Sequence, residues 1–290
     1  MTIPAYEIPT YDEYTKQCGK LRGDNLEKYK KEVQLAKDKG FDWGATVPET
    51  KTDYVVCMPK TPRMSMIEVG EYDRIAEENG FEKIASSKRI ASPGCYASGF
   101  IALVKPLIDN NIVSPDCNFY CHAMSGYSGA GKKGIALYEN DEIPLELCSP
   151  REYALTQEHK HLKEMKKISG LSVTPIFCPY ICDYYSGMLV TVPIFKSQLN
   201  SGKTVDDIKS AYRAKYNSPI VKYKDSVDNG GFIASNSKAE LDSMDIAVAG
   251  NDDRILLTAV YDNLGKGASG AALECMNIVM GLPPEYKLDL

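Results

Sequence analysis

Apolar residues follow helical spacing in the stretch that begins near Cys95. The apolar positions are Phe100, Ile101, Leu103, Val104, Leu107 and Ile108. Since residues three and four apart share one face of a helix, this spacing predicts an amphipathic helix. Pro106 lies inside it, and we expect the proline to bend the helix or shorten its regular part, because proline donates no backbone hydrogen bond.

Four further stretches have the apolar and β-branched composition of strands. They are residues 117–124, 171–177, 188–195 and 254–261. A helix is predicted over residues 204–216 with Thr204 as its N-cap, and a last helix is predicted to stop at Gly281. These elements predict an α/β protein with a mixed sheet, helices on one side of it, and a last helix that packs back toward the N-terminal part.

Composition narrows the class of protein. The chain has 290 residues, of which 43% are apolar and 25% charged, so we expect a globular protein with a substantial core. The formal net charge of −5 gives no basic field that would attract nucleic acid or anionic lipid. No apolar run reaches the roughly 18 residues of a membrane span, and the first residues do not resemble a signal peptide. The nine cysteines are therefore expected to be reduced thiols of a cytoplasmic protein.

Cys95 has the sequence setting of a nucleophile. It follows Ser92, Pro93 and Gly94, a tight turn that places the cysteine at the start of the predicted helix. The helix dipole and the free backbone N–H groups at that position favour a thiolate and can hold an oxyanion. The alternative interpretation is a small buried residue at a helix start.

A nucleophilic thiol needs a group that moves its proton, and the chain has three histidines. His159 and His161 stand two residues apart beside a charged helix start. On an extended segment both side chains face one side, whereas on a helix they diverge. They are either an acid/base pair or a solvated surface pair. His122 lies inside a strand pattern and is interpreted as a core histidine.

Two glycine-rich segments follow predicted strands. Gly126 and Gly131 have the spacing of a phosphate-binding P-loop, but Lys133 stands where that motif needs Ser or Thr to hold Mg²⁺, so ATP hydrolysis is not expected. The segment is either a flexible loop whose N–H groups meet an anionic or amide-bearing ligand, or a tight turn. The second segment, residues 262–270, has more glycine than a plain connection needs, which favours close approach to a ligand.

Two cysteine pairs raise the question of a metal site. Cys117 and Cys121, like Cys178 and Cys182, are separated by three residues, whereas zinc sites usually have two between their cysteines. We therefore expect no metal and interpret these residues as partly buried strand thiols.

Five segments, taken in order, resemble the N-acetyl-gamma-glutamyl-phosphate reductase family, especially its shorter type. They are residues 92–100, 125–132, 158–165, 185–188 and 262–281. The likeness covers about residues 84–290. It implies an NADPH-dependent oxidoreductase of arginine biosynthesis that converts N-acetyl-gamma-glutamyl phosphate to N-acetylglutamate semialdehyde through a cysteine thioester. It also implies a homo-oligomer that acts on a small-molecule substrate.

The resemblance also implies roles for single residues. Cys95 would be the nucleophile and His161 the acid/base. The residues that would contact the substrate are His159, Ser125 and Tyr96. The residues that would contact NADP are Gly126, Ser128, Gly129, Gly131 and Asn263.

The N-terminal part departs from the family's pattern. Family members open with a strand and the glycine-rich turn of a dinucleotide-binding unit, and residues 1–80 contain no such fingerprint. We therefore expect an atypical or truncated nucleotide-binding region (1–90), a catalytic and dimerisation domain (91–261), and a C-terminal ligand loop and helix (262–290). The alternatives are a cofactor-free, thioester-forming acyl-phosphate hydrolase or transferase, and a non-catalytic partner protein derived from the reductase. A nicotinamide contact at Asn263 favours the reductase, because a hydrolase has no use for it.

Overall fold

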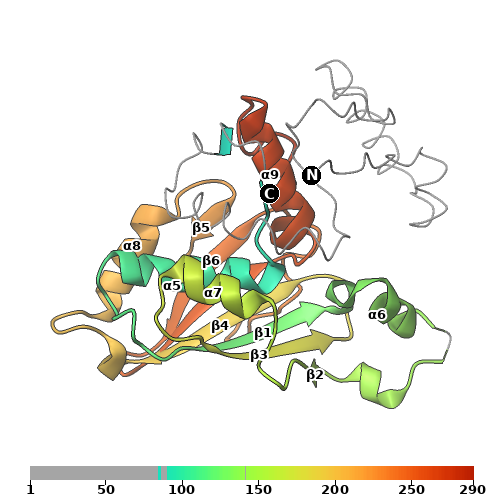
Figure 1. Cartoon of the computed structure of the whole chain (residues 1–290), viewed down its shortest axis with the longest axis horizontal. Coiled ribbons are helices and arrows are strands. Elements are labelled where there is room, and N and C mark those ends of the chain that lie inside the picture. Colours follow the sequence, from blue (N-terminus) through green and yellow to red (C-terminus); the bar gives the residue numbers. More distant parts are fainter. Residues whose placement is uncertain (1–83, 86–89, 141) are drawn as a thin grey trace, which may run out of the picture. The chain divides into compact units, whose positions relative to one another are not determined.

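A mixed seven-stranded sheet runs through the computed structural model of the chain, which describes residues 84–85, 90–140 and 142–290 (Figure 1). In sheet order the strands are β2 (Arg151–Glu152), β3 (Ile176–Cys182), β1 (Tyr120–Gly126), β4 (Met188–Phe195), β7 (Arg254–Tyr261), β6 (Met244–Gly250) and β5 (Val221–Tyr223). β1 is parallel to β3 and β5 is parallel to β6, whereas the other neighbours are antiparallel. The predicted α/β class with a mixed sheet is confirmed. The expected nucleotide-binding region, residues 1–90, lies almost wholly outside the described residues.

Three helices cover one face of this sheet, as Figure 1 shows. They are α5 (Cys95–Asp109), α7 (His161–Ser169) and α8 (Val205–Lys215). α5 contacts β4, β7 and both of the other helices. Alternate residues of β4, from Met188 to Ile194, are buried in one core with Phe100 and Leu103 of α5. The helix predicted from the apolar spacing after Cys95 thus supplies the layer that covers the sheet.

The predicted strands agree best with the structure in the middle of the sheet. β4 and β7 have the predicted bounds, and β1 begins slightly later than predicted, at Tyr120. The strand predicted over residues 171–177 is wrong in position, because β3 begins only at Ile176. Leu171 is buried without being part of a strand. Gly170 turns the chain with a φ of 78° at the end of α7, and the Leu171 side chain then packs into the core.

Other segments form structure that the patterns do not predict. β5 and β6 form one edge of the sheet, and the charged Asp245 interrupts the apolar pattern of β6. The glycine-rich segment with Gly126 and Gly131, expected to be a flexible loop or a tight turn, instead contains η2 (Tyr127–Ala130) and the start of α6 (Gly131–Tyr138). The remaining elements are η3 (Leu145–Cys148), η4 (Lys196–Gln198), the π-turn η5 (Gly265–Ser269) and α9 (Gly270–Val279). Within the described ranges, no helix is long and apolar enough to cross a membrane.

The helix ends follow local hydrogen-bonding rules. α5 ends at Asp109, soon after Pro106, and Asn110 donates to the Pro106 carbonyl from its backbone N–H (3.1 Å) and from its side-chain Nδ2 (2.8 Å). Thr204 caps α8 as predicted. Its Oγ1 accepts from the Asp207 N–H (3.4 Å), and its own N–H donates to the Asp207 carboxylate (2.9 Å).

The sheet face opposite the helices, which we call the outer face, is apolar where it is uncovered. Its residues on β1, β3, β4 and β7 are Tyr120, His122, Met124, Ile176, Cys178, Tyr180, Leu189, Thr191, Pro193 and Leu256. Tyr120 and Ile176 are 45% and 47% exposed, whereas a solvated sheet face normally carries polar side chains. The interpretation of His122 as a core histidine is wrong: the alternation of β1 buries Cys121 and turns His122 outward, where it is exposed.

The cap of α8 offers a test of the fold. Thr204→Ala removes a hydroxyl that satisfies a free N–H of the first turn, so we expect the free energy of unfolding to fall by about 1 kcal/mol. Urea unfolding measures this loss. Thr204→Ser keeps the hydroxyl and should retain most of the stability. Equal stability of the alanine variant and the wild type would contradict the assigned cap.

Candidate active site

Cys95 is held at the first position of α5 by a hydroxyl from the sheet. The Tyr261 hydroxyl, at the end of β7, donates to the Cys95 carbonyl (2.6 Å) and accepts from the Gly99 N–H (3.1 Å). These two groups are an i to i+4 pair in the first turn of the helix, next after the bond from the Ser98 N–H to the Gly94 carbonyl, so the hydroxyl bridges the two ends of that pair. A side chain at position 99 has no room, because its Cβ would lie 2.6 Å from Tyr261 Oη. The helix start is therefore fixed to the sheet at the cysteine itself.

The two paired histidines lie together, and His161 packs on Gly94, the residue before Cys95. His161 is the first residue of α7 and His159 precedes it, and their ring centroids are 4.6 Å apart. The His161 ring packs on Gly94, where a Cβ would come within 2.1 Å of Nε2. Only glycine before the cysteine permits this approach. The alternative of a solvated surface pair is wrong, because His161 is 4% exposed.

Each histidine has a distinct hydrogen-bond environment. His159 Nδ1 accepts from the backbone N–H of His161 (3.2 Å), so in the neutral ring the proton sits on Nε2, which is free to donate. His161 Nδ1 is buried and has no hydrogen-bond partner among the described residues. A buried polar atom without a partner costs about 1–3 kcal/mol of stability. The fold thus holds the His161 ring where stability alone would not place it.

Burial decides the charge of the central pair. It raises the pKa of the Cys95 thiol to about 11, outweighing the Tyr96 N–H and the Lys160 ammonium, which both lower it. Burial also lowers the pKa of His161 to about 3, with further contributions from His159 and Lys160. Burial therefore opposes the ionisation that the helix start favours, and both shifts favour the neutral forms of the thiol and the imidazole.

Two residues that the sequence analysis did not select, Glu164 and Tyr261, hold the backbone on either side of Cys95. Glu164, one turn after His161, accepts the Gly94 N–H through Oε2 (2.8 Å) and so fixes the residue before Cys95. Tyr261 holds the residues after it. His161 and Glu164 are three apart at the start of a helix, a spacing that places both on one face. That spacing is the one signal by which the sequence could have indicated Glu164.

Tyr96 lies behind the histidines. Its side chain is 3% exposed, and its ring centroid lies 5.9 Å from that of His161 and 5.3 Å from that of Phe177. The hydroxyl donates to the Tyr180 carbonyl (3.3 Å). The ring therefore supports the position of the imidazoles.

The glycine-rich segment after β1 meets the Asp262–Asn263 turn. Asn263 Nδ2 donates to Ser128 Oγ (2.9 Å), and Asn263 Oδ1 accepts from the Gly187 N–H (2.9 Å). Ser125 is fully buried, and its hydroxyl donates to the Gly126 carbonyl (3.1 Å). The structure thus brings together segments that are far apart in the sequence, as the resemblance implies.

The same turn reaches the cysteine. Asp262 Oδ1 accepts from the N–H groups of Leu264 (2.6 Å) and Gly265 (2.9 Å), which starts η5. Gly267 of η5 packs against Cys95, where a Cβ would lie 3.1 Å from the cysteine Cβ. Gly129 is similarly close to Asn263, where a Cβ would lie 3.5 Å from Nδ2. Glycines with backbone donors on this side of Cys95 suit a flat ligand with an amide group.

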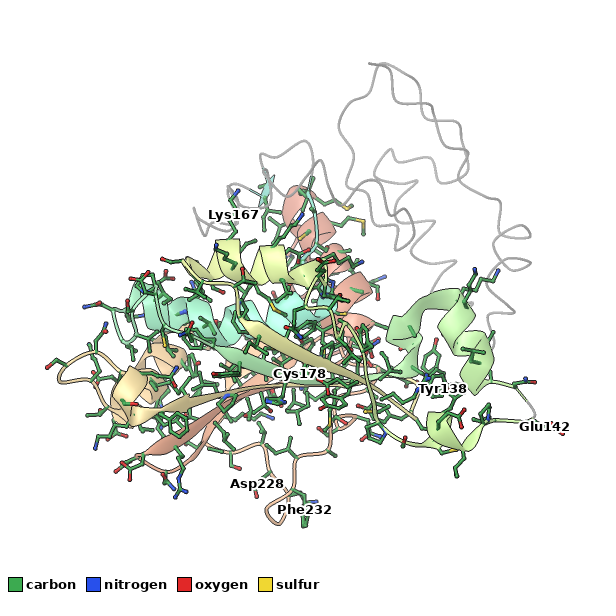
Figure 2. All side chains as sticks on the ribbon, turned by 60° about the horizontal axis from the view of Figure 1, so that its bottom comes forward. Tyr138, Glu142, Lys167, Cys178, Asp228 and Phe232 are labelled. Atoms are coloured by element: carbon green, nitrogen blue, oxygen red, sulfur yellow. The ribbon has the colours of Figure 1, made fainter. Side chains whose placement is uncertain are left out.

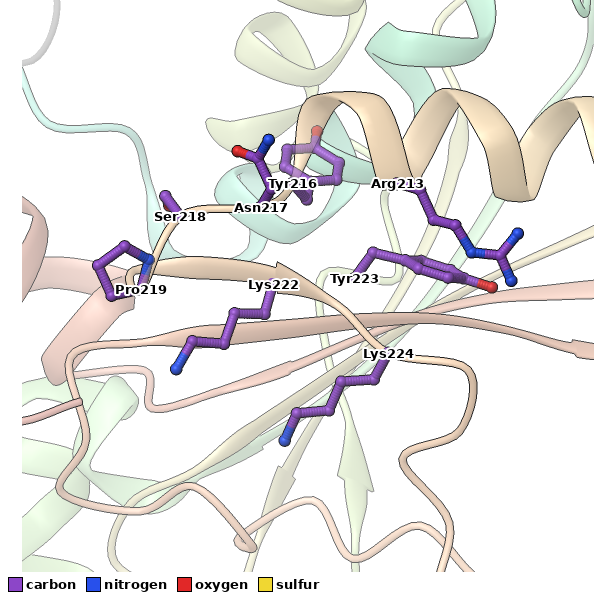
Figure 3. Close-up of a pocket in the computed structure, with 8 residues that line it drawn as sticks. All are labelled: Arg213, Tyr216, Asn217, Ser218, Pro219, Lys222, Tyr223 and Lys224. Carbon is purple, nitrogen blue, oxygen red and sulfur yellow. The ribbon is translucent and has the colours of Figure 1, made fainter.

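A pocket apart from the Cys95 site lies at the end of α8 and along β5 (Figure 3). It is lined by Arg213, Tyr216, Asn217, Ser218, Pro219, Lys222, Tyr223 and Lys224. Arg213 pairs with Asp225 (2.6 Å) and Lys224 pairs with Asp245 (2.7 Å). Because two of its three cations are neutralised within the fold, this pocket is a weaker candidate than the Cys95 site.

Comparisons with known proteins agree with this geometry. The family model described as "semialdehyde dehydrogenase, dimerisation domain" matches residues 95–263. N-acetyl-gamma-glutamyl-phosphate reductase 2 of Nostoc sp. is 36% identical over 224 residues, which are 71% of this chain and 68% of that protein. The N-acetyl-gamma-glutamyl-phosphate reductase of Allorhizobium ampelinum is 38% identical over 206 residues, 69% and 66% of the two chains. Among solved structures, aspartate semialdehyde dehydrogenase II of Vibrio cholerae has the same fold, with a TM-score of 0.55, 16% identity and coverage of 74% of this chain and 71% of its own.

The Tyr261 bridge can be tested with a matched pair of variants. Tyr261→Phe removes the hydroxyl from Cys95 and Gly99, so we expect a loss of about 1–2 kcal/mol in the free energy of unfolding and several-fold faster alkylation of Cys95 through local opening. Tyr212→Phe removes a hydroxyl that donates to the Leu103 carbonyl of the same helix, away from the cysteine. It should lower stability without changing alkylation. Equal alkylation rates in both variants would contradict the positioning role.

The buried neutral His161 makes the stability of the fold depend on pH. Its folded-state pKa, about 3, lies below the value of about 6.5 in an unfolded chain. Between these values the unfolded chain binds a proton that the folded chain does not, so stability falls as the pH drops. From pH 6.5 to 4 we expect the wild type to lose on the order of 3 kcal/mol more than His161→Gln, measured by urea unfolding at each pH. Parallel pH profiles would contradict the buried neutral state.

Proposed function

The chain belongs to the family of N-acetyl-gamma-glutamyl-phosphate reductases, and from this premise we propose that it reduces N-acetyl-gamma-glutamyl phosphate to N-acetylglutamate semialdehyde in arginine biosynthesis. The observation that carries the proposal for this chain is the Cys95 thiol at the start of α5, with the buried imidazole of His161 packed on the preceding glycine. An acyl phosphate is an activated carbonyl compound, and a positioned thiol is a suitable nucleophile for it.

Cys95 and His161 together perform the acyl transfer. Cys95 Sγ attacks the carbonyl carbon of the acyl phosphate, the carbon–sulfur bond forms, and the bond from carbon to the phosphate oxygen breaks. The thiol proton moves to His161 as the sulfur attacks. Because both groups are neutral beforehand, charge develops only when the substrate is in place. The products are a thioester on Cys95 and inorganic phosphate, which takes up one proton from the solvent as it leaves.

Membership of a reductase family implies a pyridine nucleotide cofactor, and we propose NADPH. The residues that would hold its nicotinamide are Gly126, Ser128, Gly129, Gly131 and Asn263. Asn263 Nδ2 has a second N–H beyond the one that Ser128 accepts, and Gly129 leaves space beside it, so the donor set fits a carboxamide. A bound NADPH supplies the hydride that reduces the thioester carbon. His161 returns the proton to Cys95 Sγ when the carbon–sulfur bond breaks.

The substrate is proposed to contact His159, Ser125 and Tyr96. His159 is suited to this task, because its Nδ1 is occupied by the N–H of His161 and its Nε2–H is left to donate to an anionic group. Tyr96 and Ser125 are buried, so the substrate contact proposed for them would be made from within the wall of the site. The proposed division of the chain stays as stated: nucleotide binding in residues 1–90, catalysis in 91–261 and ligand contact in 262–290.

We further propose that the active protein is a cytoplasmic homo-oligomer. The family model that matches the chain describes a dimerisation domain. The outer face, with its exposed Tyr120, Met124, Ile176 and Leu256, is the surface suited to a second copy.

Cys95→Ser is the direct test of the reaction. With acyl phosphate and NADPH present, we expect at least about 1000-fold lower turnover, because the serine hydroxyl is a far weaker nucleophile at neutral pH. Cys148→Ser changes an exposed cysteine and should leave turnover unchanged. Unchanged turnover in the Cys95 variant would overturn the mechanism.

Titration of the purified chain with NADPH, with NADH as the comparison, tests the cofactor separately. Saturable micromolar binding supports the reductase. No binding up to millimolar NADPH, with phosphate release intact, would replace the proposal with a thioester-forming hydrolase.

A further inference from the structure

The segment between β5 and β6, residues 224–243, which we call the arm, carries an exposed aromatic side chain on an ordered tip. The tip is a two-residue turn at Gly230 and Gly231, both with positive φ (60° and 86°), closed by hydrogen bonds between Asn229 and Phe232 (2.8 and 3.2 Å). Asp228 adds a bond from the Gly231 N–H (2.9 Å). Phe232 is 78% exposed. A large apolar side chain on a preorganised turn is the usual form of an interface anchor.

The arm projects on the uncovered side of the sheet. In Figure 2, Lys167 of α7 lies at the top, Cys178 of β3 lies at the level of the sheet, and Asp228 and Phe232 lie below it. The tip thus extends beyond the outer face, on the side opposite the helices.

The base of the arm explains why only part of the outer face is open. Lys238 and Lys224 both pair with Asp245 of β6 (3.4 and 2.7 Å). On this side of the sheet Asp245, Thr258 and Val260 are buried, whereas Tyr120 and Ile176 are exposed. In the sheet, Asp245 of β6 stands opposite Val260 of β7, and Tyr120 of β1 stands opposite Ile176 of β3. The open region is therefore confined to β1, β3, β4 and the start of β7, next to the arm.

The base of the arm also contacts the segments that hold the active site. The Tyr184 hydroxyl donates to Ser235 Oγ (2.6 Å), and Asn236 packs on Gly187, where a Cβ would lie 2.5 Å from the asparagine Cα. The Glu240 N–H donates to Asp262 Oδ2 (2.6 Å), from a backbone with a φ of 67°. Strain of this kind persists only where surrounding contacts hold it.

Through these contacts the arm reaches the residues around Cys95 and Asn263. Asp262 begins the turn that leads to Gly267 beside Cys95. Gly187 donates to Asn263, the proposed nicotinamide contact. One covalent segment of about twenty residues therefore runs from the interface side of the sheet to both sides of the active site.

We propose that Phe232 of each protomer seats on the open outer face of a second copy, and that the arm thereby couples assembly to the geometry of the active site. The inference rests on the proposed homo-oligomeric reductase. A two-fold arrangement satisfies it, because each copy offers both an anchor and an apolar face. The occupant is a second copy because the open face is continuous with the arm within the matched dimerisation domain.

Phe232→Asp, made in the full chain, tests the anchor. Because Phe232 is exposed, the fold should be retained, as circular dichroism and thermal unfolding verify. We expect the dissociation constant of the oligomer, from sedimentation velocity over a range of concentrations, to rise about 30-fold or more. Leu145→Asp alters a side chain that is 84% exposed on η3, which is neither in the arm nor on a strand of the outer face, and should not change assembly.

Alkylation of Cys178 provides a readout at the face itself. This outward thiol of β3 should be protected in the wild type and in Leu145→Asp, and should react faster in Phe232→Asp, as peptide mass spectrometry measures. Unchanged assembly of Phe232→Asp would overturn the proposal. A monomeric wild type whose Cys178 is protected would also overturn it, since another segment of the same chain would then cover the face.

Two measurements test the coupling. At a concentration where Phe232→Asp is monomeric, we expect at least about 10-fold lower turnover per chain and an altered rate of Cys95 alkylation. Dissociation with wild-type turnover and wild-type Cys95 reactivity would overturn the coupling. If the wild type had no reductase activity, the proposed function would fail, while sedimentation and the two alkylation rates would still decide this inference.

Discussion

The hydrogen bonds of the Tyr261 hydroxyl are the constraint on which the candidate site depends. They join the last residue of β7 to the first turn of α5, two elements separated by 166 positions between Tyr261 and Cys95. A helix packed on a sheet by apolar contacts alone keeps some freedom to slide and rotate. A hydroxyl that bridges the Cys95 carbonyl and the Gly99 N–H removes that freedom at the residue where a displacement of one ångström matters most.

Three glycines allow the other segments of the site to pack closely around the start of α5. Gly94 admits the His161 ring, Gly267 admits η5, and Gly187 admits the arm. In each place a Cβ would meet atoms at contact distance or closer, so these glycines serve approach more than local flexibility. Carboxylates that accept backbone N–H groups then fix two of these segments: Glu164 accepts from Gly94, and Asp262 accepts from Leu264 at the turn before η5. The site is thus assembled from several loops on one rigid helix–sheet unit.

The sequence predicts the parts of this arrangement that depend on local pattern. Apolar and β-branched composition defined β4 and β7, and helical spacing defined α5. Patterns failed where tertiary contacts decide: β6 contains the buried Asp245, whose charge two lysines of the arm balance. In the candidate site, glycine-rich motifs and the rare histidines indicated segments that the structure brings together. Tyr261 could not be selected, because its role is a pair of hydrogen bonds to backbone groups distant in sequence, and Glu164 had only its spacing from His161 to indicate it.

The charge state of Cys95 and His161 illustrates how local rules and the complete environment differ. The position of the thiol at a helix start favours ionisation, and the Tyr96 N–H and Lys160 act in that direction. Burial opposes it and dominates, and it keeps the imidazole neutral as well. A neutral pair avoids the large cost of isolated buried charges before substrate binds. In the proposed mechanism, the negative charge of the acyl phosphate gives an imidazolium a partner, which favours proton transfer from sulfur to nitrogen at the moment of attack. Burial lowers the reactivity of the resting thiol, and in the proposed mechanism the thiol therefore reacts only when the substrate is bound.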